Sequence, residues 1–177
     1  MVPGLKKLYT DLGYATEFLT DQADYNTHGF WTSFDQGDFV GIDTTLGQAW
    51  QWKDTTWSDR GWVYIPNSCS TVTCKVHVAF HGCYGNATDF AAYTGYREFA
   101  ANNNLIVVFP ETQCWNMTGD HPVDPYWLTK DDLFVKAVNA IICRLTSEEH
   151  NNTCPKAATT ILPFAASLLA LLTISTF

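Results

Sequence analysis

The stretch that decides the fold is KVHVAFHGC, residues 75–83. Its first half alternates apolar with other side chains, as a β-strand does when its two faces meet different surroundings. The alternation ends at His81-Gly82, where a glycine permits a sharp turn. Farther along, residues 105–109 read LIVVF and end before Pro110, which is typical of a buried parallel strand. Two strands separated by a helical segment predict an α/β fold with a mostly parallel sheet and flanking helices.

Helical spacing of apolar residues predicts three helices around these strands. The first covers residues 2–12 and ends before Gly13, which suits a left-handed C-cap. The second covers residues 88–101 and is expected to break or bend near Gly95. The third follows a sequence that begins at Thr129 and resembles a capping box.

Two further strands and one long connection complete the pattern. Residues 61–66 (GWVYIP) predict a strand that ends at a proline, and residues 16–19 predict a short buried strand. Residues 20–59 are rich in Asp, Gly, Thr and Trp and show little periodicity, so we expect a long irregular surface segment there. We expect one partial domain over residues 1–150 and a separate C-terminal segment over residues 151–177.

The composition and the charge exclude several classes of protein. Of the 177 residues, 46% are hydrophobic and 15% are aromatic, so the chain can build a core and does not have the composition of a disordered chain. Ten basic and eighteen acidic residues give a net charge of −8 at pH 7. Because nucleic acids and anionic membranes attract clustered Lys and Arg, we expect no nucleic-acid partner.

Cysteines and glycosylation sequons indicate an oxidising compartment. The chain has six cysteines, and stable disulfides form outside the cytosol. N-x-[S/T] sequons begin at Asn86, Asn116 and Asn151, and we expect glycosylation at the first two. The first residues, MVPGLKKLYT, contain no apolar segment of the signal-peptide kind, so we expect a missing front end.

The C-terminal segment resembles a membrane-attachment signal. Residues 161–177 are apolar and uncharged, and a polar stretch at residues 150–156 precedes them. A polar spacer followed by a terminal apolar tail is the pattern of a glycosylphosphatidylinositol (GPI) signal. A short tail anchor is the alternative, because about 20 apolar residues span a bilayer. The sequence predicts an extracellular or cell-surface protein that meets a membrane only through this tail.

The turn at His81, Gly82 and Cys83 is the first feature with a chemical meaning. Ligand crevices in open α/β sheets lie at the carboxyl edge of the strands. A Cys83 backbone N–H that points out of this edge would bind the oxyanion that forms when an acyl group is attacked. A plain turn with a buried histidine is the alternative, because the motif is short.

A longer block of sequence surrounds this turn. It consists of GWVYIPNSC, CKVHVAFHGC, GYREFAANNNLIVVFPET and Cys114-Trp115. In order and spacing this block, roughly residues 60–115, resembles the extracellular polyhydroxybutyrate depolymerase family of α/β-hydrolases. The resemblance implies a partial α/β-hydrolase fold of the single-domain, circularly permuted type. It also implies a carboxylic-ester hydrolase without a cofactor, acting on either an aliphatic polyester or a short-chain ester.

The resemblance also assigns roles to single residues. His28 matches the catalytic histidine, which serves as general base and acid. His81 and Gly82 match the oxyanion loop, whose donor is the Cys83 backbone N–H. Trp115 matches the aromatic residue that lines the substrate crevice. The sequence departs from the family after Trp115, where a sequon stands in place of a second tryptophan.

The nucleophile and the acid of such a hydrolase are not found in this sequence. No Gly-x-Ser-x-Gly elbow occurs, and the family's acid would fall before Met1. We therefore expect the C-terminal portion of a hydrolase, which cannot turn over an ester alone by a serine mechanism. The alternative is a non-catalytic, membrane-anchored binding protein with an α/β-hydrolase-like fold. A metal site is not expected, because no recognised ligand spacing occurs. The residues considered for one are His77, His81, Cys83 and Cys114.

The cysteines fit the family without being specific to it. Six cysteines permit many connectivities, so the sequence leaves the pairing open. Two pairs are favoured, because one would close a short loop between two strands and the other would join the ends of two strands at the same sheet edge. The last two cysteines remain for a third pair. These pairs are Cys69 with Cys74, Cys83 with Cys114, and Cys143 with Cys154.

Overall fold

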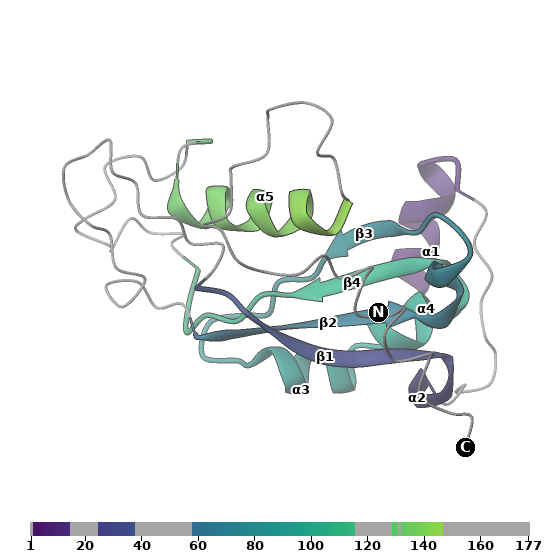
Figure 1. The fold of residues 1–177 in the computed structure, drawn as a ribbon, viewed down its shortest axis with the longest axis horizontal. Coiled ribbons are helices and arrows are strands. Elements are labelled where there is room, and N and C mark those ends of the chain that lie inside the picture. The colour runs from purple at the N-terminus through teal and green to yellow at the C-terminus, as the bar shows by residue number, and fades with distance from the viewer. Residues whose placement is uncertain (1, 15–24, 38–57, 116–128, 131, 147–177) are drawn as a thin grey trace, which may run out of the picture.

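The computed structural model describes residues 2–14, 25–37, 58–115, 129–130 and 132–146 (Figure 1). In chain order the elements are α1 (Val2–Asp11), α2 (Tyr25–His28), β1 (Gly29–Asp35), β2 (Arg60–Pro66), the 3-10 helix η3 (Asn67–Ser70), β3 (Lys75–Val78), α3 (Ala87–Tyr93), α4 (Tyr96–Asn102), β4 (Leu105–Phe109) and α5 (Leu133–Thr146). In Figure 1, α3 lies below the sheet and α5 lies above it, and α4 packs on the same face of the sheet as α3. The described residues therefore form stacked layers, with the sheet between helices on its two faces.

The four strands form one mixed sheet in the order β1-β2-β4-β3. β2 is antiparallel to both of its neighbours, β1 and β4, and only β3 and β4 are parallel. The expected α/β layering is present, but the expectation of a mostly parallel sheet is wrong for the described strands. A parallel pair needs a crossover connection, and α3 with α4 supplies one between β3 and β4. No described helix lies between β1 and β2.

Strand β1 is an element that the sequence analysis missed. The segment over residues 20–59 was expected to be irregular, yet β1 pairs with β2 from Gly29 opposite Pro66 to Asp35 opposite Arg60. Its sequence, GFWTSFD, contains the aromatic and β-branched residues that strands favour. Most of its side chains are half-buried on both faces, so no clear alternation marks the strand. Residues 38–57 and the strand expected at residues 16–19 lie outside the described residues.

Side chains on the two faces of the sheet form separate cores. Tyr64 of β2 and Val107 of β4 belong to the core that α1, α3 and α4 cover. Val63 and Val108, their neighbours in sequence, belong to the core on the other face, with Ile141 of α5. Successive residues of a strand point to opposite faces, so the apolar runs of β2 and β4 fill both cores. The prediction that residues 105–109 form a buried strand is confirmed.

The expected helices are confirmed, and glycines set two of their boundaries. Gly13 (φ 79°) follows α1, and Gly95 (φ 77°) separates α3 from α4. Both lie in the left-handed region, which costs a glycine little. Helix α5 begins after Asp132, whose Oδ1 accepts the N–H groups of Phe134 and Val135 at 2.8 and 3.2 Å. This side-chain cap satisfies amide groups that have no partner inside the helix.

Helix α1 is joined to the sheet by a tyrosine–histidine contact. The Tyr9 hydroxyl lies 2.8 Å from His77 Nδ1, and the Tyr9 ring lies against Phe99 of α4. Burial lowers the pKa of His77. Burial, with the neighbouring Tyr96 and Tyr14, raises the pKa of Tyr9 to about 12. Both groups are therefore neutral at pH 7, and the Tyr9 hydroxyl donates to His77 Nδ1.

Disulfides tie loops at both ends of the sheet. The two pairs among the described residues are Cys69–Cys74 and Cys83–Cys114, as expected. The first includes a cysteine of η3, and the second joins the loops that follow β3 and β4. Cys143 of α5 is also disulfide-bonded, and its expected partner, Cys154, lies outside the described residues.

Several predictions concern membrane attachment and glycosylation. No helix in the described part of the chain is both long and apolar enough to cross a membrane. The expected tail within residues 151–177 and the sequon at Asn116 lie outside the described residues. Asn86 is exposed, and its Oδ1 accepts the Asp89 N–H at 2.7 Å at the start of α3. Its sequon therefore lies on the surface, and its glycosylation stays a prediction.

Candidate active site

Two loops meet at the edge of the sheet where the parallel strands β3 and β4 end. The loop after β3 carries His81, Gly82 and Cys83, and the loop after β4 comprises residues 110–115. The disulfide between Cys83 and Cys114 brings their Cα atoms to 4.2 Å, and the Tyr84 N–H donates to a carbonyl of the second loop at 2.8 Å. Ligand sites in α/β sheets lie at this carboxyl edge. We call these two loops together the edge site.

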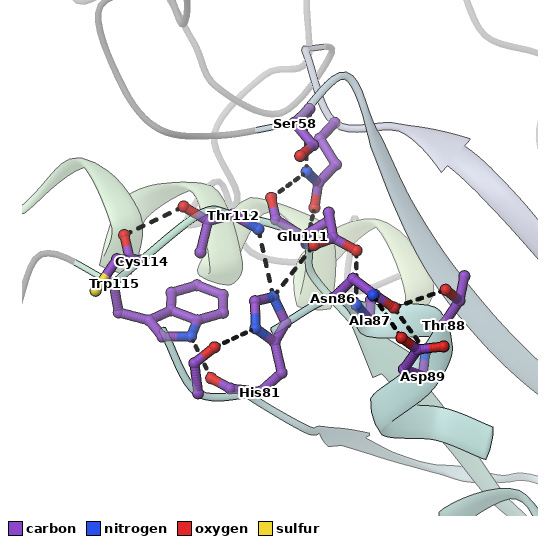
Figure 2. A network of polar contacts seen from close by, with 12 residues as sticks. Ser58, His81, Asn86, Ala87, Thr88, Asp89, Glu111, Thr112, Cys114 and Trp115 are labelled. Atoms are coloured by element: carbon purple, nitrogen blue, oxygen red, sulfur yellow. Dashed lines mark hydrogen bonds and ion pairs between the residues drawn. The ribbon is translucent and has the colours of Figure 1, made fainter. Parts of the chain in front are cut away.

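His81 is the buried centre of the edge site (Figure 2). Only 3% of the residue is exposed. Its Nδ1 lies 2.7 Å from the carbonyl oxygen of Gly82, and its Nε2 lies 3.4 Å from Oε1 of Glu111. Its own carbonyl accepts the indole N–H of Trp115 at 2.8 Å. Both ring nitrogens and the main chain of His81 are therefore engaged within the two loops.

Glu111 joins the edge site to a helix and to a strand. Its Oε2 accepts the N–H of Ala87, the first residue of α3, at 2.6 Å. A carboxylate at a helix N-terminus is stabilised by the helix dipole and by unpaired amide groups. The main chain of Glu111 exchanges two hydrogen bonds with the side-chain amide of Gln36, both at 2.9 Å. Glu111 is thus held from three directions.

Cys83 presents its backbone at the surface. The residue is exposed, and its N–H has no hydrogen-bond acceptor in the described part of the chain. A Cβ on the preceding Gly82 would meet no atom within 4 Å. Within the described residues, the loop is therefore open to solvent at Gly82 and Cys83, as a site for an external acceptor requires.

Two aromatic side chains also belong to the edge site. Phe80 is 49% exposed and meets Trp115 edge to face, with ring centroids 4.6 Å apart. Trp115 is half-buried, and its other contacts include Phe134 of α5 at 6.0 Å. The predicted crevice residue therefore lies at the edge site, where it also joins the loop to α5.

His28 is not brought together with the edge site. It ends α2 and is exposed, and its Nδ1 lies 3.0 Å from the hydroxyl of Thr27. Gly29 pairs with Pro66, at the end of β2 that lies beside the start of β4. His28 therefore lies at the opposite edge of the sheet, and β4 alone spans roughly 13 Å at about 3.3 Å per residue. A general base must reach its nucleophile by a hydrogen bond, and no nucleophile is identified in this sequence, so the catalytic role of His28 stays a prediction.

The described residues hold no metal-binding cluster. No three His, Cys, Asp or Glu side chains among them gather closely enough to bind an ion. Cys83 and Cys114 are joined in a disulfide, and His77 contacts Tyr9, so the four residues once considered as ligands have other partners.

Glu111 and Gln36 were not identified from the sequence. The sequence does contain a pattern that points to Glu111. An acid that follows β4 lies at the same edge of the sheet as a histidine that follows the parallel strand β3. No such pattern points to Gln36, since it meets Glu111 across 75 positions of sequence and directly follows β1, the strand that was missed.

Comparison with known proteins gives a consistent result. A poly(3-hydroxybutyrate) depolymerase of Delftia acidovorans is 31% identical over 140 residues, which are 72% of this chain and 26% of that protein. A polyhydroxybutyrate depolymerase of Talaromyces funiculosus is 30% identical over 81 residues, which are 42% of this chain and 24% of that protein. The chain belongs to the polyhydroxybutyrate depolymerase family. No family model matches it.

A solved structure of a depolymerase has a similar fold. A polyhydroxybutyrate depolymerase variant complexed with an R3HB trimer superimposes with a TM-score of 0.57 at 21% identity, covering 81% of this chain and 46% of that one. The fold of this chain is accordingly α/β-hydrolase-like, with the mixed sheet described above. The chain spans about a quarter of the length of the two curated depolymerases, at 26% and 24%.

Proposed function

We propose that this chain supplies the oxyanion-binding edge of a carboxylic-ester hydrolase. The observation that carries the proposal is the backbone N–H of the exposed residue Cys83, which has no acceptor among the described residues and lies at the carboxyl edge of β3. Attack on an ester carbonyl places negative charge on its oxygen, and a fixed amide donor stabilises that charge. Loss of one such donor typically costs a factor of about 100 to 1,000 in kcat.

The rest of the catalytic machinery lies outside the edge site. The sequence contains no Gly-x-Ser-x-Gly elbow, and His28 is at the opposite edge of the sheet. A serine mechanism needs a nucleophile and a base within hydrogen-bond reach of each other. In this proposal they come from residues of the full gene product other than those of the edge site.

The proposed substrate is an aliphatic hydroxyacid ester of the polyhydroxybutyrate type, either as polymer or as a short-chain ester. The flat rings of Phe80 and Trp115 in the two loops of the edge site suit an apolar acyl chain. The names of the curated relatives and the R3HB trimer in the solved relative point to the same class of ester. No cofactor is needed for this chemistry.

The proposed location is extracellular or at the cell surface. The disulfides Cys69–Cys74 and Cys83–Cys114 support an oxidising compartment. Attachment through a GPI-type tail within residues 151–177 and glycosylation at Asn86 and Asn116 remain part of the proposal, on the sequence patterns given above.

A second proposal is a non-catalytic binding protein of the same fold. The position of His28, away from the edge site, favours it, because no described histidine other than the buried His81 lies at that edge. Such a protein would bind the ester at the same place without cleaving it.

Titration of the isotope-labelled chain with the R3HB trimer tests both proposals. We expect the trimer to shift the backbone amide signal of Cys83 and the ring signals of Phe80 and Trp115. Gly82→Leu should weaken binding, because it puts a side chain beside the Cys83 N–H at a place where a Cβ meets no other atom. Gly4→Leu is the matched control, since a Cβ at Gly4 also meets nothing within 4 Å.

Turnover then separates the two proposals. Release of hydroxybutyrate by the full gene product, reduced by Gly82→Leu and not by Gly4→Leu, supports the hydrolase. Binding at Cys83 without turnover by the full product supports the binding protein. Absence of any shift at Cys83 contradicts both.

A further inference from the structure

We propose that the imidazole of His81 is a positioning residue that sets the direction of the Cys83 N–H. This inference deepens the proposed function and rests on it for its chemical meaning. It concerns the side chain of His81 and the peptide group between Gly82 and Cys83. The catalytic contact itself belongs to that peptide and not to the imidazole.

The peptide between Gly82 and Cys83 is held by its carbonyl. The Gly82 oxygen lies 2.7 Å from His81 Nδ1 and accepts the N–H of Gly85 at 3.1 Å. The described residues contain no cis peptide bond. In a planar trans peptide the C=O and N–H bonds point in opposite directions. A carbonyl that is tied inward therefore directs the Cys83 N–H outward, to the exposed side of the loop.

His81 must donate in this contact. A carbonyl oxygen can only accept a hydrogen bond, so Nδ1 carries a proton. The other nitrogen, Nε2, lies 3.4 Å from Glu111 Oε1 and 3.5 Å from the N–H of Thr112. It donates to the carboxylate when the ring is charged and accepts from Thr112 when the ring is neutral. The Nδ1–H remains in both states, so the contact with Gly82 persists in both.

The ring is itself fixed in place. Its own residue is 3% exposed, and Trp115 holds the His81 carbonyl at 2.8 Å. Glu111 on the other side is tied to Ala87 at the start of α3. Glycine gives the chain wide freedom at position 82, so an unrestrained peptide could rotate there. The His81 ring removes that freedom at the one peptide whose orientation matters.

Two substitutions separate the contact of His81 Nδ1 with Gly82 from the contact of Nε2 with Glu111. Asparagine places its amide nitrogen near the position of a histidine Nδ1, and glutamine places its own near that of Nε2. His81→Asn should therefore retain the donor to Gly82, while His81→Gln should lose it and keep a polar contact with Glu111. Both variants are polar and uncharged, so a general effect of removing histidine should appear in both.

The readout is the amide signal of Cys83 and its hydrogen-exchange rate in the labelled chain. We expect the wild-type signal in His81→Asn. In His81→Gln we expect a displaced or broadened signal, with the Trp115 indole signal and the melting temperature as measures of the fold. A folded His81→Gln variant with an unchanged Cys83 signal, or equal changes in both variants, would overturn the proposal.

A measurement on the unaltered chain covers the case in which a variant does not fold. The Nδ1 proton of His81 should give a signal that exchanges slowly with solvent and is coupled in space to Gly82. An Nδ1 proton in rapid exchange contradicts the proposal.

Kinetics of the full gene product test the functional meaning separately. If that product hydrolyses esters, His81→Gln should lower kcat by about 10- to 100-fold with KM nearly unchanged, and His81→Asn should restore most of it. Equal kcat values in both variants would contradict the link to catalysis. Absence of turnover in the unaltered product contradicts the hydrolase proposal alone, because the amide signals report the peptide direction without any reaction.

Discussion

Gln36 shows how one buried amide connects three strand ends. The residue has no exposed surface. Its Nε2 donates to the carbonyls of Ser58 and Glu111 at 2.8 and 2.9 Å, and its Oε1 accepts the Glu111 N–H. It therefore links the end of β1, the approach to β2 and the loop after β4. Gly61 of β2 is needed beside it, because a Cβ there would lie 2.6 Å from Gln36 Oε1.

Replacing Gln36 by alanine should destabilise the protein strongly. The change leaves the Glu111 N–H and the Ser58 carbonyl without this partner, while the Glu111 carbonyl keeps the N–H of Ser58. Each buried unsatisfied group costs about 1–3 kcal/mol. We expect a loss of about 2–4 kcal/mol in the free energy of unfolding, measured by urea denaturation. Gln113→Ala is the control, because Gln113 is exposed and its side chain makes no hydrogen bond in the described residues. Equal losses in the two variants would contradict the role of Gln36.

The residues of the edge site differ in how far the sequence predicts them. His81, Gly82 and Cys83 were identifiable, because a strand that ends in a His-Gly turn is a local pattern. The position of His28 was not, because a residue's edge depends on strand direction, and β1 was not predicted. Side-chain contacts such as that of Gln36 with Glu111 depend on distant parts of the chain, so no short pattern encodes them.

At the scale of elements, the docking of α1 should depend on pH. Burial lowers the pKa of His77, so the unfolded chain takes up this proton at a higher pH than the folded chain. Stability from this group is therefore fully present above its unfolded pKa of about 6.5 and is lost as the pH falls through the lower, folded pKa. The free energy of unfolding, followed from pH 7.5 downward, should show this loss.

His77→Asn provides the comparison for this prediction. Asparagine keeps a polar group near the position of Nδ1, where it meets the Tyr9 hydroxyl, and it does not titrate. The variant should be less stable at pH 7.5 and should depend less on pH below 6.5 than the unaltered chain. An identical pH dependence in the two proteins would show that His77 is not the group responsible.

Elements were predicted well where their signals are local. The helices and the buried strand at residues 105–109 follow from helical spacing, a continuous apolar run and glycine boundaries. The direction of pairing did not follow, because the apolar run of β2 fits an antiparallel strand as well as a parallel one. β1 was missed because its half-buried faces obscure the alternation that marks a strand.

At the scale of the whole molecule, the two described disulfides should contribute unequally. Cys83 and Cys114 are 31 positions apart, and Cys69 and Cys74 are 5 apart. A crosslink restricts the unfolded chain more when its loop is longer, which gives about 3–4 kcal/mol for the first pair and about 2 kcal/mol for the second.

Serine pairs test this difference. The double variant Cys83→Ser with Cys114→Ser should lower the free energy of unfolding more than Cys69→Ser with Cys74→Ser, as measured by urea denaturation. A larger loss from the short loop would contradict the loop-length argument. Both contributions require an oxidising compartment, because a reducing environment would break the disulfides.

The outer edge of β3 sets a condition on whatever segment lies next to it. Within the described residues β3 pairs only with β4, so the backbone N–H and C=O groups on its other side can pair with a further strand. A strand added there in parallel would end near the Cys83 N–H, so the turn that follows this strand would lie at the edge site. A strand added antiparallel would begin there, so the turn that follows this strand would lie at the opposite edge of the sheet. The direction of one neighbouring strand therefore decides whether the edge site gains a reacting group, in the same chain or from a second one.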